Sequence, residues 1–421
     1  MREMKDSGVE WIGNIPEKWN IGKVKHHYSL QSGFTPDTKN ESFYDDENGF
    51  DWVTISDIND GKIITSTKKK ISAKYIKEFS PTIIPKGSLL YSFKLSVGQT
   101  AFAGKDLYSN EAIAAFLPQN DISLIFLRYS SFLIEENSEI NIYGAKILNR
   151  ERIKNALVIY PPLPEQQSIA AHLDKKCSQI DALINNAQQQ IEKLKAYKQS
   201  IITEAVTKGL DPDAPMKDSG VEWIGEIPEH WSAAPIRSLF RIKKDIIGHE
   251  PDTVLSITQN GLRVKDISEN SGQMANSYAH YQIVNIGDFA MNHMDLITGG
   301  VGISELEGVT SPDYRVFVMR NKEMNPRYFL YVFQMYYRNR IFYAFGQGAA
   351  NVGRWRLPAQ NFNTIAIPLA PVEEQNDIVA FLDTKCSQID KLISMKEQKI
   401  DKLQQYKKSL IYEYVTGKKE V

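Results

Sequence analysis

The side chains best suited to hydrogen-bond with a nucleic-acid base lie in a glycine-rich stretch late in the chain, GQGAANVGRWRL at residues 346–357. Arginine can form two hydrogen bonds with guanine, and asparagine or glutamine can form two with adenine. The glycines between them permit a close approach of the backbone to a ligand. The candidate base contacts are therefore Gln347, Asn351, Arg354 and Arg356. A purely structural glycine-rich connection is an equally open interpretation of this stretch.

A shorter polar stretch, YGAKILNR at residues 143–150, precedes the middle of the chain. It combines an aromatic ring with cationic and amide side chains, and it is the counterpart of the glycine-rich stretch. Its candidates for nucleic-acid contact are Tyr143, Lys146, Asn149 and Arg150.

Other cations are suited to phosphate groups rather than to bases. The run Lys68, Lys69 and Lys70 could bind phosphates, and so could Lys94, which precedes a turn containing Gly98. A solvated surface run is the alternative for the three consecutive lysines. Further candidates for contacts with a phosphate backbone are Lys243, Lys244, Arg263 and Lys265.

Motifs for catalysis are incomplete wherever they begin. The sequence Tyr160-Pro161-Pro162-Leu163 has the prolines of an adenine-methylase motif but lacks the preceding amide or acid. Residues 98–105 are similar to a phosphate-binding loop, but the spacing is wrong and Asp106 replaces the expected serine or threonine. The seven histidines are scattered, and neither cysteine has a ligand cluster near it. We expect no catalytic residues, no cofactor site and no metal site in this chain.

Composition places few constraints on partners. The chain has 421 residues, of which 50 are lysine or arginine and 51 aspartate or glutamate, so it is no general polycation. No apolar run is long enough to span a membrane and the first residues do not form a signal peptide, so we expect a cytoplasmic protein. Cys177 and Cys386 occupy equivalent repeat positions, and buried thiols are favoured over a disulfide between them.

The elements that must position these side chains are duplicated. MKDSGVEWIG occupies residues 4–13 and recurs unchanged at 216–225, and each copy continues into IPExW, ending at Trp19 or Trp231. CSQIDALI at 177–184 returns as CSQIDKLI at 386–393. The stretches between the repeats differ, so the sequence predicts two versions of one unit held in a common frame. The apolar residues Val9, Trp11 and Ile12 could either dock partners or pack inside that frame.

Each variable stretch reads as a mixed α+β module. In the first, β-type runs lie at residues 52–56, 88–93 and 112–117, followed by an amphipathic helix near 122–136. In the second, such runs lie at 253–258, 287–292 and 314–319, followed by a helix over 326–342. Both modules close with an apolar strand that leads to proline.

A long helix follows each module. Pro164 followed by Glu165 suits a helix start, and Gly209 suits its end; the second helix starts near Glu373 and ends at Gly417. Each would be about 60 Å long at about 1.5 Å per residue. Apolar residues at helical spacing predict that the two helices pack against each other, about a pseudo-two-fold axis and antiparallel, or else act only as a dimerisation device. This stripe includes Ile169, Leu173, Ile180, Leu183, Ile184, Ala187, Ile191, Leu194, Tyr197, Ile201 and Ala205 in the first helix, and Ile389, Leu392, Ile393, Ile400, Leu403, Tyr406 and Leu410 in the second.

Together, KDSGVEWIGxIPExW before a variable module and PLPEQQxIAxxLDxKxxxID after it resemble the specificity subunit of type I restriction-modification systems. The resemblance spans essentially the whole chain, with the frame motifs twice in the expected order. It implies two target recognition domains that each read half of a bipartite double-stranded DNA target. It also implies that two modification subunits, which bind S-adenosylmethionine and methylate adenine, dock on the frame. Two restriction and translocation subunits, which use ATP, would join the complex for host defence.

Carried over by position, the resemblance divides the chain as follows. Residues 1–19 form an N-terminal frame segment, 20–160 the first recognition domain (module 1), and 161–210 the central spacer helix. Residues 211–231 are a linker and the repeated frame segment, 232–368 the second recognition domain (module 2), and 369–421 the C-terminal spacer helix.

Two other functions remain open at this stage. One is a self-contained DNA-modifying enzyme with unrecognised motifs, and the other is a protein scaffold that does not read DNA. Activity of the isolated chain would favour the first. The target bases and the gap between the half-sites do not follow from a single sequence.

Overall fold

The chain forms two compact units in a computed structural model. The structure describes residues 2–59, 61–94, 96–140, 144, 146–259, 261–266, 275–348 and 355–421. Unit 1 comprises Met1–Ala187 and Gln398–Val421, and unit 2 comprises Gln188–Glu397. Two long helices, α6 (Leu163–Lys208) and α11 (Val372–Val415), each contribute one part to unit 1 and another to unit 2. No helix among the described residues is long and apolar enough to cross a membrane.

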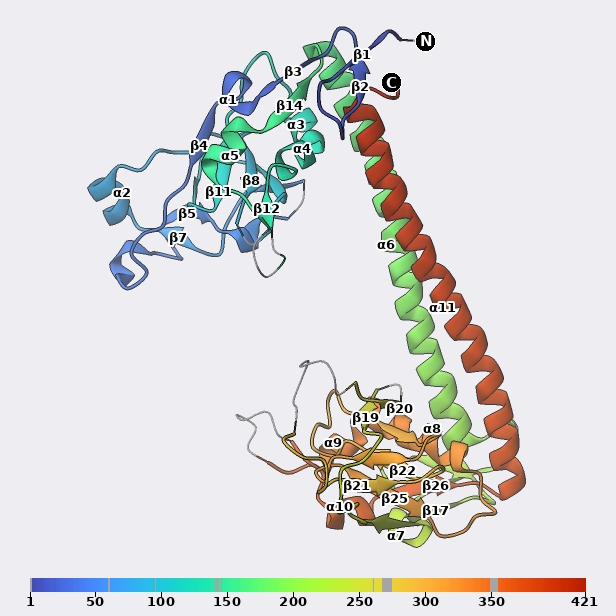
Figure 1. Ribbon diagram of the computed structural model, residues 1–421. Helices are drawn as coiled ribbons and strands as arrows, with labels where there is room; N and C mark the ends of the chain where they lie inside the picture. The colour runs from blue at the N-terminus through green and yellow to red at the C-terminus, as the bar shows by residue number, and fades with distance from the viewer. Residues whose placement is uncertain are drawn as a thin grey trace. The chain divides into compact units, whose positions relative to one another are not determined.

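Module 1 is built on a five-stranded sheet of order β4-β11-β8-β9-β6, with a three-stranded sheet β10-β5-β7 beside it (Figure 1). All neighbours in the larger sheet are antiparallel except β6 and β9. Before the first sheet strand come β1 (Met4–Asp6), β2 (Asn14–Pro16), β3 (Asn20–Lys23) and α1 (Val24–His27). The strands of the two sheets are β4 (Leu30–Ser32), β5 (Phe50–Val53), β6 (Lys62–Ile64), β7 (Lys70–Ile71), β8 (Leu89–Ser92), β9 (Thr100–Ala103), β10 (Tyr108–Ser109) and β11 (Ile113–Phe116). The other elements are the 3-10 turns η1 (Glu41–Phe43) and η2 (Ile55–Asp57), then α2 (Ala73–Phe79), α3 (Leu124–Ser130), α4 (Phe132–Glu135), β12 (Glu139–Ile140), β13 (Lys146–Ile147), α5 (Arg150–Asn155) and β14 (Leu157–Tyr160).

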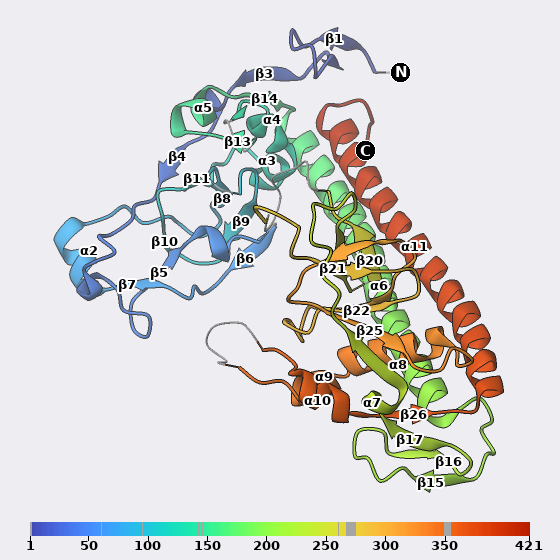
Figure 2. The same ribbon diagram turned by 60° about the horizontal axis from the view of Figure 1, so that its bottom comes forward.

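Module 2 repeats the core of that design with different additions. Its four-stranded antiparallel sheet, β18-β25-β22-β23, has the same chain order and pairing as β4-β11-β8-β9 in module 1. Two-stranded pairs β19-β20 and β21-β24 replace the second sheet of module 1. Figure 2 labels one strand of each pair, β20 and β21. The frame segment before module 2 forms β15 (Met216–Asp218) and β16 (Glu226–Pro228). The strands that follow are β17 (Ser232–Pro235), β18 (Phe240–Lys243), β19 (Leu255–Thr258), β20 (Gly261–Val264), β21 (Gln282–Val284), β22 (Phe289–Met291), β23 (Val301–Ile303), β24 (Gly308–Thr310), β25 (Arg315–Met319) and β26 (Ala366–Leu369). The helices are α7 (Ile236–Leu239), α8 (Pro326–Arg338), α9 (Ile341–Ala344) and α10 (Ala359–Thr364).

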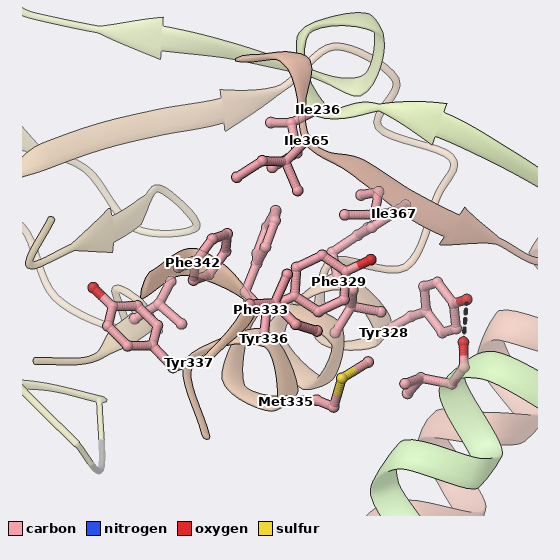
Figure 3. Close-up of a cluster of buried hydrophobic side chains, with 14 of the residues drawn as sticks. Ile236, Tyr328, Phe329, Phe333, Met335, Tyr336, Tyr337, Phe342, Ile365 and Ile367 are labelled. Atoms are coloured by element: carbon pink, nitrogen blue, oxygen red, sulfur yellow. Dashed lines mark hydrogen bonds between the residues drawn. The ribbon is translucent and has the colours of Figure 1, made fainter. Parts of the chain in front are cut away.

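Helix α8 carries the aromatic core of unit 2 (Figure 3). Asn325 caps it by accepting a hydrogen bond from the backbone of Arg327, and Pro326 suits the first helical position. Its buried rings include Tyr328, Phe329 and Phe333. The Tyr328 hydroxyl donates to the backbone oxygens of Val206 and Pro368, both at 3.2 Å, so the ring joins the module to α6 and to β26.

The predicted strands are confirmed, while two predicted helices need correction. Five of the six β-type runs contain a strand, namely β8 and β11 in module 1 and β19, β22 and β25 in module 2. The sixth run, 52–56, overlaps only the end of β5, because Ile55 already begins the 3-10 turn η2. The helix expected near residues 122–136 is two short helices, α3 and α4, separated at Ser131, whose hydroxyl bonds to the Arg128 backbone oxygen. The helix expected over 326–342 is likewise α8 followed by α9, because Arg340 adopts a left-handed conformation with φ of 58° between them.

Both long helices have the predicted bounds, since they end just before Gly209 and Gly417. Each of these glycines has a positive φ, which lets the chain turn away from the helix. The predicted apolar stripe needs one correction. Leu183 and Tyr197 of α6 and their counterparts Leu392 and Tyr406 of α11 are 48%, 58%, 47% and 54% exposed. Cys177 and Cys386 are free, buried thiols, as expected.

Candidate nucleic-acid interface

The glycine-rich stretch of module 2 is closed by an antiparallel backbone pair between Gln347 and Arg356, called the neck below. Gln347 and Arg356 bond to each other through their backbones, at 2.8 and 3.1 Å, and both side chains are exposed. The Trp355 indole donates to the Tyr343 backbone oxygen at 2.7 Å and stacks on the Tyr343 ring. Two of the predicted base contacts, Asn351 and Arg354, lie outside the described residues. The structure therefore places Gln347 and Arg356 side by side, and the contact of Trp355 with Tyr343 stabilises this pair.

A buried cation lies beneath this neck. Arg315 donates to the Leu357 backbone oxygen at 2.8 Å, and its guanidinium lies over the Phe362 ring. The Leu357 amide in turn bonds to the backbone oxygen of His293 at 2.9 Å. Burial, and then the charges of Arg315 and Arg356, lower the pKa of His293 to about 3, so this imidazole is neutral near pH 7. Sequence reasoning missed both supporting residues; the single arginine within the apolar run YRVFVM was the available signal.

In module 1 the equivalent polar stretch is spread over a hairpin and a helix start. Lys146 lies on β13 and donates to Glu135 at 2.8 Å, which raises the pKa of its ammonium. Asn149 caps α5 by accepting from the Arg152 backbone, so its amide oxygen has a structural role. Arg150 is exposed at the first position of that helix, and Tyr143 lies outside the described residues.

Thr67, the residue before the lysine run of module 1, is hydrogen-bonded to a buried carboxylate. Asp51 accepts from the backbone and the hydroxyl of Thr67, at 2.7 and 3.0 Å, and pairs with Lys105. Burial alone would raise the pKa of Asp51, but the bonds from Lys105 and Thr67 lower it. Lys68 and Lys69 are exposed beyond this anchor, whereas the Lys70 ammonium bonds to the Glu47 backbone oxygen at 2.7 Å. Two of the three lysines are thus presented to solvent on a fixed loop.

The remaining cations differ in exposure. Lys94 is exposed and lies 3.8 Å from Glu111 beside the turn that contains Gly98. The prediction that Lys243 contacts a phosphate backbone is wrong, because its side chain is buried and its ammonium pairs with Asp288 at 2.7 Å. An ammonium that neutralises a buried carboxylate is not presented to a phosphate. The other three cations are placed as follows: Lys244 and Arg263 are exposed, and Lys265 is half-buried.

A polar hollow of about 150 Å³ in module 2 was not predicted. It lies between the end of β19, the segment leading into β23, and helix α8. Its polar lining side chains are Gln259, Gln334, Tyr337 and Arg338. Gln259 donates to the Thr298 backbone oxygen at 3.2 Å, so its amide also fixes one wall. Gln259 lies 75 positions before Gln334 in the chain, and no local pattern connects the two.

The incomplete methylase motif has a structural explanation. Tyr160 ends β14, and the Pro162 backbone oxygen accepts hydrogen bonds from the amides of Glu165 and Gln166 in the first turn of α6. The two prolines therefore shape a strand-to-helix connection. Among the described residues, no group of three or more His, Cys, Asp or Glu side chains is arranged to hold a metal ion.

Comparison with known proteins gives a consistent result. The family model for the type I restriction modification DNA specificity domain matches residues 16–193. The MjaX specificity subunit of a type I restriction enzyme from Methanocaldococcus jannaschii is 25% identical over 437 residues, covering 97% of this chain and 95% of that protein. The MjaVIII specificity subunit from the same organism is 24% identical and covers 96% and 93%.

A solved structure from a study of complex assembly and conformational transition of the type I R-M system has the same fold. It matches with a TM-score of 0.68 over 96% of this chain and 99% of that chain, at 16% identity. Two modules of related topology, the repeated frame motifs and these full-length matches agree. Over almost its whole length the chain is similar to specificity subunits of type I restriction enzymes, and residues 16–193 match the type I restriction modification DNA specificity domain.

Proposed function

We propose that this chain recognises a bipartite double-stranded DNA sequence for a type I restriction-modification complex. Module 1 reads one half of the target and module 2 reads the other. The observation that carries this proposal is that the same frame contacts occur twice, while the two modules they hold differ in their added strands and in their exposed polar side chains. Identical supports with different surfaces suit a target with two different halves.

The repeated contacts begin at the frame tryptophans. The buried indoles of Trp19 and Trp231 donate to Glu165 and Glu374, which occupy equivalent positions in the first turns of α6 and α11. The same rings pack against the glycines at the helix ends. A Cβ added to Gly209 would lie 3.3 Å from Trp231, and one added to Gly417 would lie 3.0 Å from Trp19. This packing supports a structural role for the frame segments.

We further propose that α6 and α11 form one antiparallel coiled coil that sets the gap between the half-sites. In unit 1, Asp181 pairs with Lys407 at 2.7 Å. In unit 2, Asp390 pairs with Lys198 at 2.6 Å, and these are the equivalent positions with the roles of the two helices exchanged. Such reciprocity is what a pseudo-two-fold axis produces.

Two equivalent apolar patches support the docking of two modification subunits. Leu183 and Tyr406 are exposed in unit 1, close in sequence to the Asp181–Lys407 pair. Leu392 and Tyr197 are exposed in unit 2, equally close to the Asp390–Lys198 pair. Exposed apolar side chains at equivalent positions of both units suit two equivalent protein interfaces. In this proposal the modification subunits bind S-adenosylmethionine, two restriction subunits use ATP, and this chain has no catalytic activity.

Reconstitution tests the proposed activity directly. The purified chain, the modification subunit and S-adenosylmethionine are incubated with genomic DNA, and methylated adenines are mapped by sequencing. We expect methylation at a two-part site only in the mixture. Methylation by the isolated chain would favour a self-contained enzyme, and a mixture that methylates without sequence preference would favour a scaffold.

Matched insertions test the spacer. Four residues inserted after Gln190 and four after the equivalent Lys399 lengthen both helices by about 6 Å, which corresponds to about two base pairs of duplex at about 3.4 Å per pair. We expect the gap in the methylated sequence to grow while both half-sites stay the same. An unchanged gap contradicts the spacer role.

Charge substitution tests the docking patches. The double variant Leu183→Glu with Tyr406→Glu should lose one of two modification subunits, measured as a change in complex mass. The variant Gln179→Glu with Gln404→Glu adds the same charges at exposed polar positions of unit 1 and should keep both subunits. Retention of both subunits by the first variant contradicts docking at this patch.

A further inference from the structure

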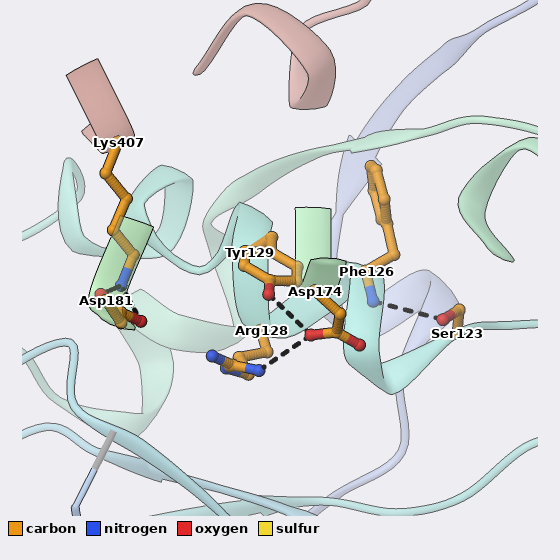
Figure 4. Close-up of polar contacts among 7 residues, drawn as sticks. All are labelled: Ser123, Phe126, Arg128, Tyr129, Asp174, Asp181 and Lys407. Carbon is orange, nitrogen blue, oxygen red and sulfur yellow. Dashed lines mark hydrogen bonds and ion pairs between the residues drawn. The ribbon is translucent and has the colours of Figure 1, made fainter. Parts of the chain in front are cut away.

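In each unit a frame aspartate binds both a tyrosine and an arginine of the module. In unit 1, Asp174 of α6 accepts from the Tyr129 hydroxyl at 2.6 Å and from the Arg128 guanidinium at 3.3 Å (Figure 4). The guanidinium also lies against Gly61, where an added Cβ would be 2.5 Å from its carbon. Asp174 is thereby linked to α3 and, through Arg128, to the loop before β6.

Unit 2 has the same arrangement. Asp383 of α11, at the position equivalent to Asp174, accepts from the Tyr331 hydroxyl at 2.7 Å and from Arg327 at 2.8 Å. Burial, and then the bond to the aspartate, raise the pKa of Tyr129 and of Tyr331, so both hydroxyls remain protonated donors.

The two arginines do not occupy equivalent positions. Tyr129 follows the residue before its helix, Ser123, by six positions, and Tyr331 follows Asn325 by the same number. Arg128 directly precedes its tyrosine, whereas Arg327 comes one helical turn before Tyr331. The ion pair is therefore not a simple copy carried along by the duplication. Two differently built modules supply the same cation to the same carboxylate from different places.

Each module has a second fixed point on its helix. The side-chain oxygen of buried Gln166 accepts from the Ser123 backbone at 2.9 Å, and that of Gln375 accepts from the Asn325 backbone at 2.9 Å. Gln166 and Asp174 are about 12 Å apart along the helix axis. With one contact alone the module could rotate about that contact. Two contacts at this separation fix the direction of the module's helix along the frame helix.

We infer that Asp174 and Asp383 are positioning residues that set the angle of each recognition module and thereby limit the target to one gap length. This inference rests on the proposed function and adds the residues that control its geometry. Both aspartate side chains are more than 30% exposed, so their ion pairs contribute little to stability. The geometric role can therefore be separated from folding.

The test compares Asp174→Ala with Asp181→Ala in the reconstituted complex. Asp181 is a matched control, because it is a partly exposed aspartate on the same helix whose carboxylate pairs with Lys407 of the other frame helix. DNA duplexes carry the two half-sites at the native gap and at gaps one base pair shorter or longer. For Asp174→Ala we expect relative methylation at the altered gaps to rise about tenfold, the change that a lost charged hydrogen bond produces. Base preference within each half-site should stay unchanged, and Asp174→Asn, which keeps an acceptor for Tyr129, should restore part of the gap preference.

A second measurement does not depend on DNA. Nitroxide labels at Lys154→Cys in module 1 and at Lys176→Cys on α6 report the distance between module and helix within unit 1. We expect the distance distribution to broaden in Asp174→Ala and to stay narrow in Asp181→Ala. An unbroadened distribution overturns the positioning role. If the distribution broadens but the wild-type complex has no two-part target, the proposed function is wrong, while the positioning role of Asp174 is confirmed.

Discussion

Module 1 and module 2 share a four-stranded antiparallel core and differ in what is added to it. Module 1 adds β6, parallel to β9, and the sheet β10-β5-β7, which carries the exposed Lys68 and Lys69 at its edge. Module 2 adds the hairpin β19-β20 with Arg263 and the braced neck with Gln347 and Arg356. In both modules a tyrosine, an arginine and a backbone amide bond to equivalent residues of α6 and α11, although the two arginines come from different positions. The difference shows that what touches the frame is constrained and what faces outward is free to vary.

Removal of a frame tryptophan should have the largest effect. Trp19 and Trp231 are both fully buried and bond to equivalent glutamates, so Trp19→Ala and Trp231→Ala should each lower the free energy of unfolding by about 3–5 kcal/mol. Denaturant unfolding of the full chain measures the change. Unequal losses would show that the two frame copies are not equivalent supports.

A pH titration should separate the two modules. The pKa of His293 is lowered to about 3 in the folded state, below its ordinary value near 6.5, so the unfolded chain binds the additional proton between these values. Stability is therefore greatest above about pH 6.5 and should fall, by on the order of 3 kcal/mol, as the pH drops toward 3. Hydrogen exchange should show unit 2 losing protection before unit 1. In His293→Gln this early loss should disappear, and its persistence would assign the acid sensitivity elsewhere.

Removing one exposed arginine should affect one half-site only. Arg356→Ala should weaken recognition of the half-site read by module 2 by about 1–3 kcal/mol and leave the other half-site unchanged. Methylation rates on duplexes with single substitutions in either half measure this. Lys244→Ala, an exposed cation of the same module, serves as the control and should not alter base preference. Equal effects on both halves would contradict separate reading.

The smallest expected effect comes from the lysine run. Lys68→Ala with Lys69→Ala should weaken binding to all sequences alike and reduce the salt dependence of binding by about one phosphate contact for each lysine. Fluorescence anisotropy over a range of salt concentrations measures the slope. Lys70→Ala should change the slope less, because the Lys70 ammonium already bonds to Glu47. An unchanged slope in the double variant would identify a solvated charge run.

Most of the secondary structure followed from local sequence. Pro164, Gly209 and Gly417 act on neighbouring backbone, so the helix ends were predictable. Five of the six β-type runs contain strands, and the sixth overlaps the end of β5. The breaks at Ser131 and Arg340 were not predicted, because the amphipathic pattern continues through both positions. Among candidate contacts, the exposure of Arg356 agrees with its predicted role, whereas Lys243 was misplaced because its partner Asp288 lies 45 residues away.

Local sequence was enough to identify the duplicated frame, the bounds of the long helices and the resemblance to type I specificity subunits, because repeats, helix starts and helix ends depend on residues adjacent in the chain. Only the tertiary structure decided which polar side chains are available. Lys243 pairs with a carboxylate inside module 2, and Arg315 bonds to the Leu357 backbone. Arg128 and Arg327 pair with equivalent aspartates from different positions. These outcomes depend on pairs of residues brought together from distant parts of the chain, and no local pattern records such pairs.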